Sequence, residues 1–162
     1  MKSIVVYESH YGHTAYVADR FLEALKKKGE AEIFELLEDT QAKSMPNNIE
    51  NKAKSRGVGP EQIPCDMRNY DCLCLCIPIW DKCLASPLAG YIERCVNADG
   101  KNIICCQIYG DKKDNKLCFD YVKKALEGKG RPKIAGVFIN WRDVHNERLL
   151  NKLINKTINK IA

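Results

Sequence analysis

The chain has 162 residues, an apolar fraction of 45% and a formal net charge of +5, from 26 Lys and Arg against 21 Asp and Glu. This length suits a single domain, over residues 1–162, that buries a sizeable core without metal ions or disulfide bonds. No apolar run approaches the roughly 20 residues that cross a bilayer, so no membrane span is expected. Glu8 and His10 interrupt the apolar start of the chain and no cleavage site follows, so we predict a first strand and a cytoplasmic location.

Strand and helix patterns alternate from the start of the chain. Ser3–Tyr7 is a continuous, largely β-branched run, typical of a strand that is covered on both faces. Apolar residues at helical spacing predict a helix over Thr14–Gly29, where the glycine favours a helix end. Ala31–Leu37 predicts a second strand. Residues 40–69 are the least regular part, and we expect a short helix over Asn47–Lys54 there.

The second half of the chain repeats this alternation three times. The predicted elements are a strand over Asp71–Ile77, a helix over Ala85–Val96, a strand over Asn102–Ile108, a helix over Leu117–Leu126, a strand over Lys133–Trp141 and a helix over Val144–Ile161, with His145 capping or beginning the last helix. Buried strands that are joined by helices imply parallel pairing through right-handed crossovers. The sequence therefore predicts an α/β fold with a five-stranded, doubly wound parallel sheet.

The nine cysteines need a separate explanation. Five of them lie inside predicted strands: Cys72, Cys74, Cys76, Cys105 and Cys106. A free cysteine in such a place behaves as a small apolar residue, and reduced thiols are expected where no secretion signal is present. The spacing also lacks the CxxC pairs of common metal sites. We therefore predict that these cysteines pack in the core and bind no metal.

The positive charge makes acidic partners and nucleic acids worth considering. The lysines are spread over several predicted helices, including the last one, which is typical of solvated helix faces. No basic stripe interleaved with aromatic residues is evident, so we do not predict nucleic-acid binding.

Ligands of doubly wound sheets bind at the carboxyl ends of the strands, where the strand order reverses. The loop after the first strand, Glu8–Thr14 (ESHYGHT), has hydroxyl side chains, a glycine and a following helix N-terminus, which together suit a phosphate group. It lacks the lysine of a Walker loop and the glycines of a dinucleotide loop. From these residues alone, an ordinary Ser/Thr-capped turn remains an equal alternative.

Three segments resemble the flavin loops of flavodoxins. Ser9–Thr14 (SHYGHT) is similar to the phosphate loop (S/T)-x-T-G-(N/H)-T. Asn69–Asp71, followed by an apolar strand and then Pro78–Trp80 (PIW), resembles the pattern YD-x-φ-x-φ-G-x-P-I-W, in which φ is apolar. Tyr109–Asp111 with Cys118–Phe119 resembles the third loop, GD…FC. The three matches fall in order at predicted strand ends, and the resemblance covers nearly the whole chain.

This resemblance implies a flavodoxin-like three-layer fold with sheet order 2-1-3-4-5 and a non-covalently bound flavin mononucleotide (FMN) that carries electrons. It implies no catalytic acid, base or nucleophile, and a redox partner that is a protein or a small acceptor. The implied cofactor-binding residues are Ser9, His10, Tyr11, Gly12, His13 and Thr14 in the phosphate loop, Pro78, Ile79, Trp80 and Asp81 along the isoalloxazine ring, and Tyr109, Gly110 and Asp111 over its pyrimidine side.

The chain departs from the family pattern at several positions. Glu8 adjoins the phosphate loop, so its carboxylate must point away or pair with a lysine. Tyr11 replaces a threonine, and Cys76 replaces a glycine that lets backbone approach a ligand. The loop Trp80–Pro87 has no glycine, so the peptide flip that stabilises a flavodoxin semiquinone is not expected.

The sequence leaves three functions open. The chain is an electron carrier, or an NAD(P)H-dependent FMN or quinone reductase, or a flavodoxin-like domain that has lost its flavin and serves as a binding or regulatory module. Lys82, Lys112 and Lys113 lie in or beside the flavin loops, where cations favour reduced flavin and raise its potential.

Overall fold

The protein is described here from a computed structural model, which covers residues 1–37, 57–58, 60–79, 86–110 and 115–161. The helix expected over Asn47–Lys54 lies outside these residues. Within them, no helix is long and apolar enough to span a bilayer.

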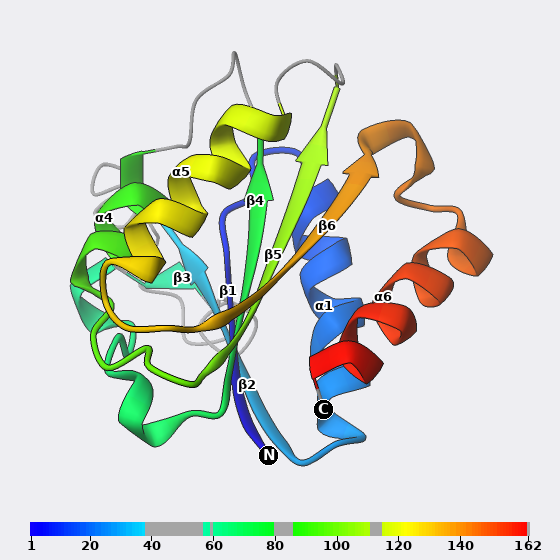
Figure 1. The fold of residues 1–162 in the computed structure, drawn as a ribbon. Helices are drawn as coiled ribbons and strands as arrows, with labels where there is room; N and C mark the ends of the chain where they lie inside the picture. The colour runs from blue at the N-terminus through cyan, green and yellow to red at the C-terminus, as the bar shows by residue number, and fades with distance from the viewer. Residues whose placement is uncertain (38–56, 59, 80–85, 111–114, 162) are drawn as a thin grey trace, which may run out of the picture.

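The centre of the molecule is a single parallel sheet (Figure 1). Its strands are β1 (Lys2–Tyr7), β2 (Glu30–Leu36), β3 (Gly57–Val58), β4 (Cys72–Pro78), β5 (Asn102–Tyr109) and β6 (Lys133–Asn140). They lie in the order β3-β2-β1-β4-β5-β6. The five long strands, counted along the chain, have the predicted order 2-1-3-4-5, and the two-residue β3 extends the edge beside β2.

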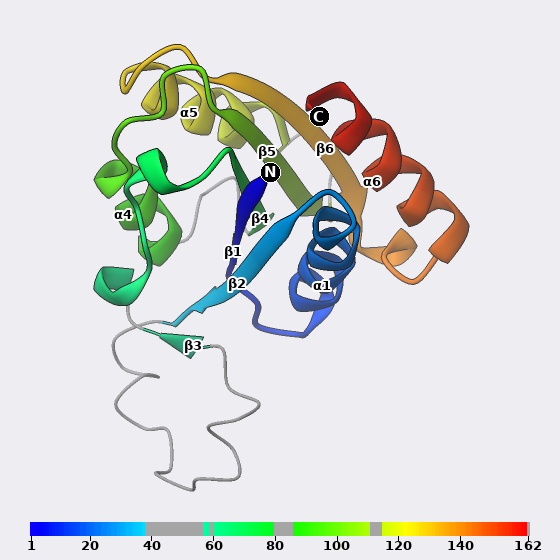
Figure 2. The same cartoon turned by 90° about the horizontal axis from the view of Figure 1, so that it is seen from below.

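Helices cover both faces of the sheet and give three layers. They are α1 (His13–Lys26), α4 (Ser86–Arg94), α5 (Asn115–Glu127) and α6 (Glu147–Ile161). Figures 1 and 2 show α1 and α6 together on one face and α4 and α5 on the other. Because parallel strands need crossover helices, and because right-handed crossovers alternate sides where the order reverses, this arrangement follows from the alternating sequence pattern.

The two faces of β4 explain its unbroken apolar sequence. Leu73, Leu75 and Ile77 face the core beneath α4 and α5, whereas its cysteines face the core beneath α1 and α6. The five cysteines that we assigned to strands are all fully buried, as predicted: Cys72, Cys74, Cys76, Cys105 and Cys106. Burial raises the pKa of Cys72 to about 12, which keeps this thiol neutral. The described cysteines are free.

The connection between β6 and α6 differs from the sequence prediction. The strand ends at Asn140, and Trp141–Asp143 forms a short 3₁₀ turn because the Asn140 side chain accepts the N–H of Arg142 at 3.0 Å. The helix begins at Glu147 rather than Val144. Its cap is Asn146, whose side-chain oxygen accepts the N–H of Leu149 at 3.2 Å, and not His145.

The end of α1 also falls short of the predicted boundary. The helix ends at Lys26, and Gly29 lies in the following turn with φ +154°. A Cβ at Gly29 would lie 2.0 Å from the carbonyl oxygen of Met1, so only glycine fits this close approach.

Candidate functional site

The sequence motifs meet at one edge of the sheet, where the long strands end. The strand order reverses between β1 and β4, because β2 and β4 lie on opposite sides of β1. Such a switch point is the ligand-binding position of doubly wound sheets. The structure describes the first loop completely, and the second and third up to Ile79 and Gly110. Several predicted residues lie outside the described part: Trp80, Asp81, Asp111, Lys82, Lys112 and Lys113.

The first loop turns sharply into α1 at Gly12. This residue has φ +84°, in the left-handed region that favours glycine, and space for a Cβ remains open around it. The Ser9 Oγ accepts the N–H groups of Gly12 at 3.1 Å and Ala15 at 3.2 Å. A serine hydroxyl accepts two hydrogen bonds and donates one. Ser9 therefore caps the loop, and its hydroxyl proton takes no part in these two hydrogen bonds.

The first turn of α1 is suited to an anion. Its N–H groups at His13 and Thr14 have no intrahelical acceptor, since an α-helix bonds each N–H to the carbonyl four residues earlier. The turn contains no acidic residue, and the helix dipole makes this end positive. The Thr14 side chain is buried beneath the loop, whereas His13 is half-buried. The donor set of the loop fits a phosphate group.

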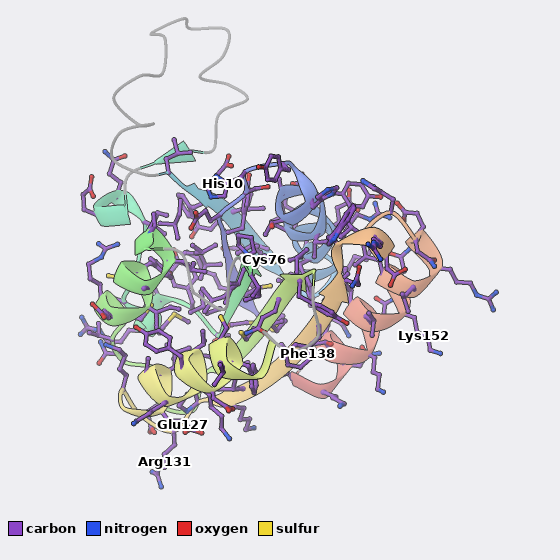
Figure 3. The ribbon with its side chains drawn as sticks, turned by 90° about the horizontal axis from the view of Figure 1, so that it is seen from above. His10, Cys76, Glu127, Arg131, Phe138 and Lys152 are labelled. Carbon is purple, nitrogen blue, oxygen red and sulfur yellow. The ribbon has the colours of Figure 1, made fainter. Side chains whose placement is uncertain are left out.

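Glu8 is the exception to this positive environment. Its side chain is buried, and its Oε1 lies 2.9 Å from Nε2 of His10. The sequence prediction was that Glu8 points away or pairs with a lysine, and the partner found among the described residues is His10. His10 lies two residues after Glu8 in the same loop, so its side chain can reach the carboxylate. Figure 3 shows His10 at this edge of the sheet. When protonated, His10 offsets the charge of Glu8 beside the loop.

Tyr11 and Cys76, which replace residues of the flavodoxin pattern, differ in their exposure to solvent. The Tyr11 side chain is 75% exposed, so the aromatic ring that replaces threonine extends from the loop surface. Cys76, labelled in Figure 3, is fully buried, with its Sγ 3.9 Å from that of Cys74. Its side chain belongs to the core beneath α1 and α6.

The ends of β4 and β5 are held close together. The N–H of Ile79 donates to the carbonyl of Ile108 at 2.9 Å, which continues the strand pairing beyond Pro78. Ile79 is buried and Tyr109 is half-buried. The described parts of the second and third loops therefore start from neighbouring positions, as the resemblance implies.

A fourth segment, which the sequence reasoning missed, joins this edge. Trp141 follows β6, and its ring centroid lies 5.7 Å from that of His13 on α1. A Cβ at Gly110 would lie 3.7 Å from Cδ1 of Trp141, and the Asn140 side chain donates to the Gly110 carbonyl at 3.2 Å. The position of Trp141 at the carboxyl end of a predicted strand was the signal that could have found it.

The start of α6 is fixed to the start of α1. The ring centroid of His145 lies 4.9 Å from that of Tyr16 and 5.8 Å from that of His13. The Tyr16 hydroxyl donates to Glu147, which also accepts from Arg20 at 2.7 Å. The Tyr16–Glu147 hydrogen bond raises the pKa of Tyr16 and lowers the pKa of Glu147. These contacts support the loop from the α6 side.

The described residues contain no group of three or more His, Cys, Asp or Glu side chains placed to hold a metal ion.

The fold is similar to several solved structures. Bacillus cereus flavodoxin 1, in its oxidised form, aligns with a TM-score of 0.62 at 14% identity, over 96% of this chain and 98% of that chain. An NADH:FMN oxidoreductase in its apo form aligns with a TM-score of 0.65 at 17% identity, over 100% of this chain and 91% of that chain. No protein-family model and no curated protein matches the chain.

A third similar structure is longer than this chain. A flavo di-iron protein of Thermotoga maritima aligns with a TM-score of 0.63 at 14% identity, over 99% of this chain but only 36% of that chain. At sequence identities this low, structural similarity shows a shared fold and not a shared activity. With the sheet order, the three layers and these similarities together, the chain has the flavodoxin-like fold.

Proposed function

We propose that this chain is a redox protein that binds FMN non-covalently and transfers electrons through it. The observation that carries the proposal is the geometry of the first loop at the switch point of the sheet. Gly12 turns the chain, Ser9 caps the turn, and the first N–H groups of α1 face the loop without an acidic neighbour in that turn. The proposal is supported further by flavodoxins among the similar structures.

In this proposal, the N–H groups of His13 and Thr14 and the hydroxyls of Ser9 and Thr14 hold the FMN phosphate. The His13 ring adds a donor whose orientation is set by Trp141 and His145. Bound FMN supplies reversible one- or two-electron chemistry. The backbone at the ends of β4 and β5 lies beside the flavin ring and restricts the access of water to it.

The remaining residues of the proposed site come from all three loops. Pro78, Ile79, Trp80 and Asp81 line one side of the ring, Tyr109, Gly110 and Asp111 cover the pyrimidine side, and His10 and Tyr11 complete the phosphate loop. We place the protein in the cytoplasm, with a protein or a small molecule as its electron partner.

Carrier and reductase remain distinct versions of this proposal. Lys82, Lys112 and Lys113, which are in or beside the flavin loops in the sequence, favour the reductase, because cations near the flavin favour its reduced form and raise its potential. The buried carboxylate of Glu8 beside the phosphate loop favours a different candidate, a domain that has lost its flavin and serves as a binding or regulatory module.

Titration of the purified chain with FMN and with riboflavin tests the proposal. Flavin fluorescence should be quenched on binding, and FMN should bind more tightly than riboflavin because only FMN carries the phosphate. Absence of FMN binding, together with an intact far-UV circular dichroism spectrum, would contradict the proposal and support the flavin-free domain. Steady-state turnover of NAD(P)H with a quinone then separates the reductase from the carrier.

A further inference from the structure

The solvent side of α6 carries an uninterrupted row of cations. Arg148, Lys152, Lys156 and Lys160 follow at four-residue intervals, and all four are exposed. With a rise of 1.5 Å per residue, this cation row is about 18 Å long. Figure 3 shows the Lys152 side chain directed away from the body of the molecule. The other side of the helix is buried through Leu150, Ile154, Thr157 and Ile158. The cation row is therefore fixed toward solvent.

No carboxylate of the described residues forms an ion pair with the cation row. Glu147 is the only acidic residue of α6, and it is held by Tyr16 and Arg20 of α1. Like charges at four-residue spacing destabilise a helix, because their side chains are neighbours on its surface. The row thus opposes the stability of the helix that carries it, as expected for a surface kept for binding an anionic partner.

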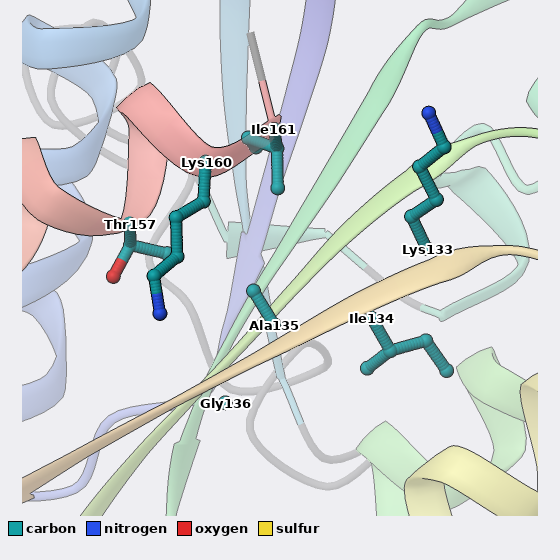
Figure 4. A pocket seen from close by; sticks show the side chains of 7 residues that line it. All are labelled: Lys133, Ile134, Ala135, Gly136, Thr157, Lys160 and Ile161. Atoms are coloured by element: carbon teal, nitrogen blue, oxygen red, sulfur yellow. The ribbon is translucent and has the colours of Figure 1, made fainter.

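A hollow of about 330 Å³ continues this surface beyond the last lysine. It lies between β6 and the end of α6, with Lys160 and Lys133 on opposite sides (Figure 4). The Thr157 hydroxyl also lines the hollow, but it donates to the carbonyl of Leu153 at 2.8 Å. The hollow therefore adds positive charge at the end of the row.

The exposed side chains of α6 favour one class of anionic partner over the others. Its remaining exposed side chains include Asn151, Asn155 and Asn159, and the helix has no aromatic residue on which a nucleic-acid base could stack. It presents no large apolar side chain on the exposed face to anchor in a membrane. Lysines and asparagines without apolar contacts form wet, salt-dependent interfaces, which suit brief encounters between redox proteins.

We propose that the cation row docks an acidic electron-transfer protein. The redox part of this inference rests on the proposed FMN function. The Arg148 end of the row begins seven residues after Trp141, whose ring contacts His13 at the phosphate loop. A partner seated at the Arg148 end of the row therefore lies beside the end of the sheet at which FMN is proposed to bind, whereas Lys160 lies near Lys133 at the start of β6. Electrostatic attraction raises the rate of such encounters.

The test measures binding of a fluorescently labelled, acidic plant-type [2Fe–2S] ferredoxin by anisotropy, with and without FMN. At an ionic strength of about 10 mM, where the Debye length is about 30 Å, Lys152→Gln/Lys156→Gln should weaken binding about fivefold or more. The matched control, Lys123→Gln/Lys124→Gln on α5, removes the same charge from exposed positions and should change binding less than about twofold. Binding of the unaltered chain should weaken when the ionic strength is raised to about 0.15 M.

Three results would overturn the proposal. Equal effects of the two double variants would mean that net charge alone attracts the ferredoxin. Unchanged ferredoxin binding by the α6 variant would show that the row does not dock this class of protein. If the α6 variant lost binding to a short DNA duplex but not to the ferredoxin, the row would be assigned to nucleic acid. If the unaltered chain binds the ferredoxin but does not bind FMN, the docking proposal stands and the proposed FMN function fails.

Discussion

Replacing Ser9 by alanine and Thr14 by valine should separate phosphate recognition from the rest of flavin binding. Ser9 lies in the loop before α1 and Thr14 lies in its first turn, and each hydrogen bond from a hydroxyl to a dianionic phosphate contributes about 1.5–3 kcal/mol. Loss of both corresponds to a roughly hundredfold or greater rise in the Kd of FMN, since each 1.4 kcal/mol is about tenfold. Riboflavin has no phosphate, so its Kd should change by less than about threefold.

The structure also predicts a cost that is separate from the ligand. The Ser9 Oγ accepts two backbone N–H groups, at 3.1 and 3.2 Å, so Ser9→Ala removes a cap whose loss costs about 0.5–2 kcal/mol of stability. Thr14→Val keeps the shape of a buried side chain and removes only its hydroxyl. Ser9→Thr keeps both the hydroxyl and the cap, and serves as the control.

The assay is fluorescence titration of FMN and riboflavin into each variant, with urea unfolding of the apo protein as the stability measurement. The ratio of the two Kd values isolates the phosphate contribution, because a distorted loop affects both ligands. If the double variant weakened FMN and riboflavin by the same factor, the first loop would not be the phosphate site.

Four further predictions test other parts of the molecule. In a Trp141→Phe background, Trp80 emission should be quenched by FMN, and unchanged emission would place Trp80 away from the ring. Because residues 80–87 contain no glycine, dithionite titration of the FMN-loaded protein should show little blue neutral semiquinone, and an abundant one would contradict this reading. Asn146→Ala should cost about 0.5–2 kcal/mol in urea unfolding by removing the α6 cap, and an unchanged midpoint would disprove that role. Ellman's reagent should label Cys72 only after unfolding, because its thiol is fully buried and burial raises its pKa to about 12; rapid labelling of Cys72 in the native protein would refute this.

The sheet could be predicted from the sequence because its signals are local. The unbroken apolar run of β4 requires burial on both faces, which requires helices on both sides of the sheet. The alternation of strand and helix then leaves few topologies, and the carboxyl ends of parallel strands share one edge. The place of the first loop beside the switch point follows from the same pattern.

Side-chain partners were decided by the tertiary structure. The sequence prediction for Glu8 was that it points away or pairs with a lysine, and it did not include the contact with His10 that the folded loop makes. The ring of Trp141 meets that of His13 only because β6 and α1 end and begin at the same edge. No periodicity in the sequence relates two residues so far apart along the chain.

The start of α6 and the orientation of its two sides also depend partly on the sequence and partly on the tertiary structure. The sequence by itself determined that α6 is amphipathic and that its lysines recur at four-residue intervals. Its start at Glu147 depended on side-chain hydrogen bonds of Asn140 and Asn146, which compete locally with the helix and are not visible as periodicity. The packing of α6 against α1 and β6 then decided which side is buried and which carboxylate is engaged, and so left the cation row facing solvent.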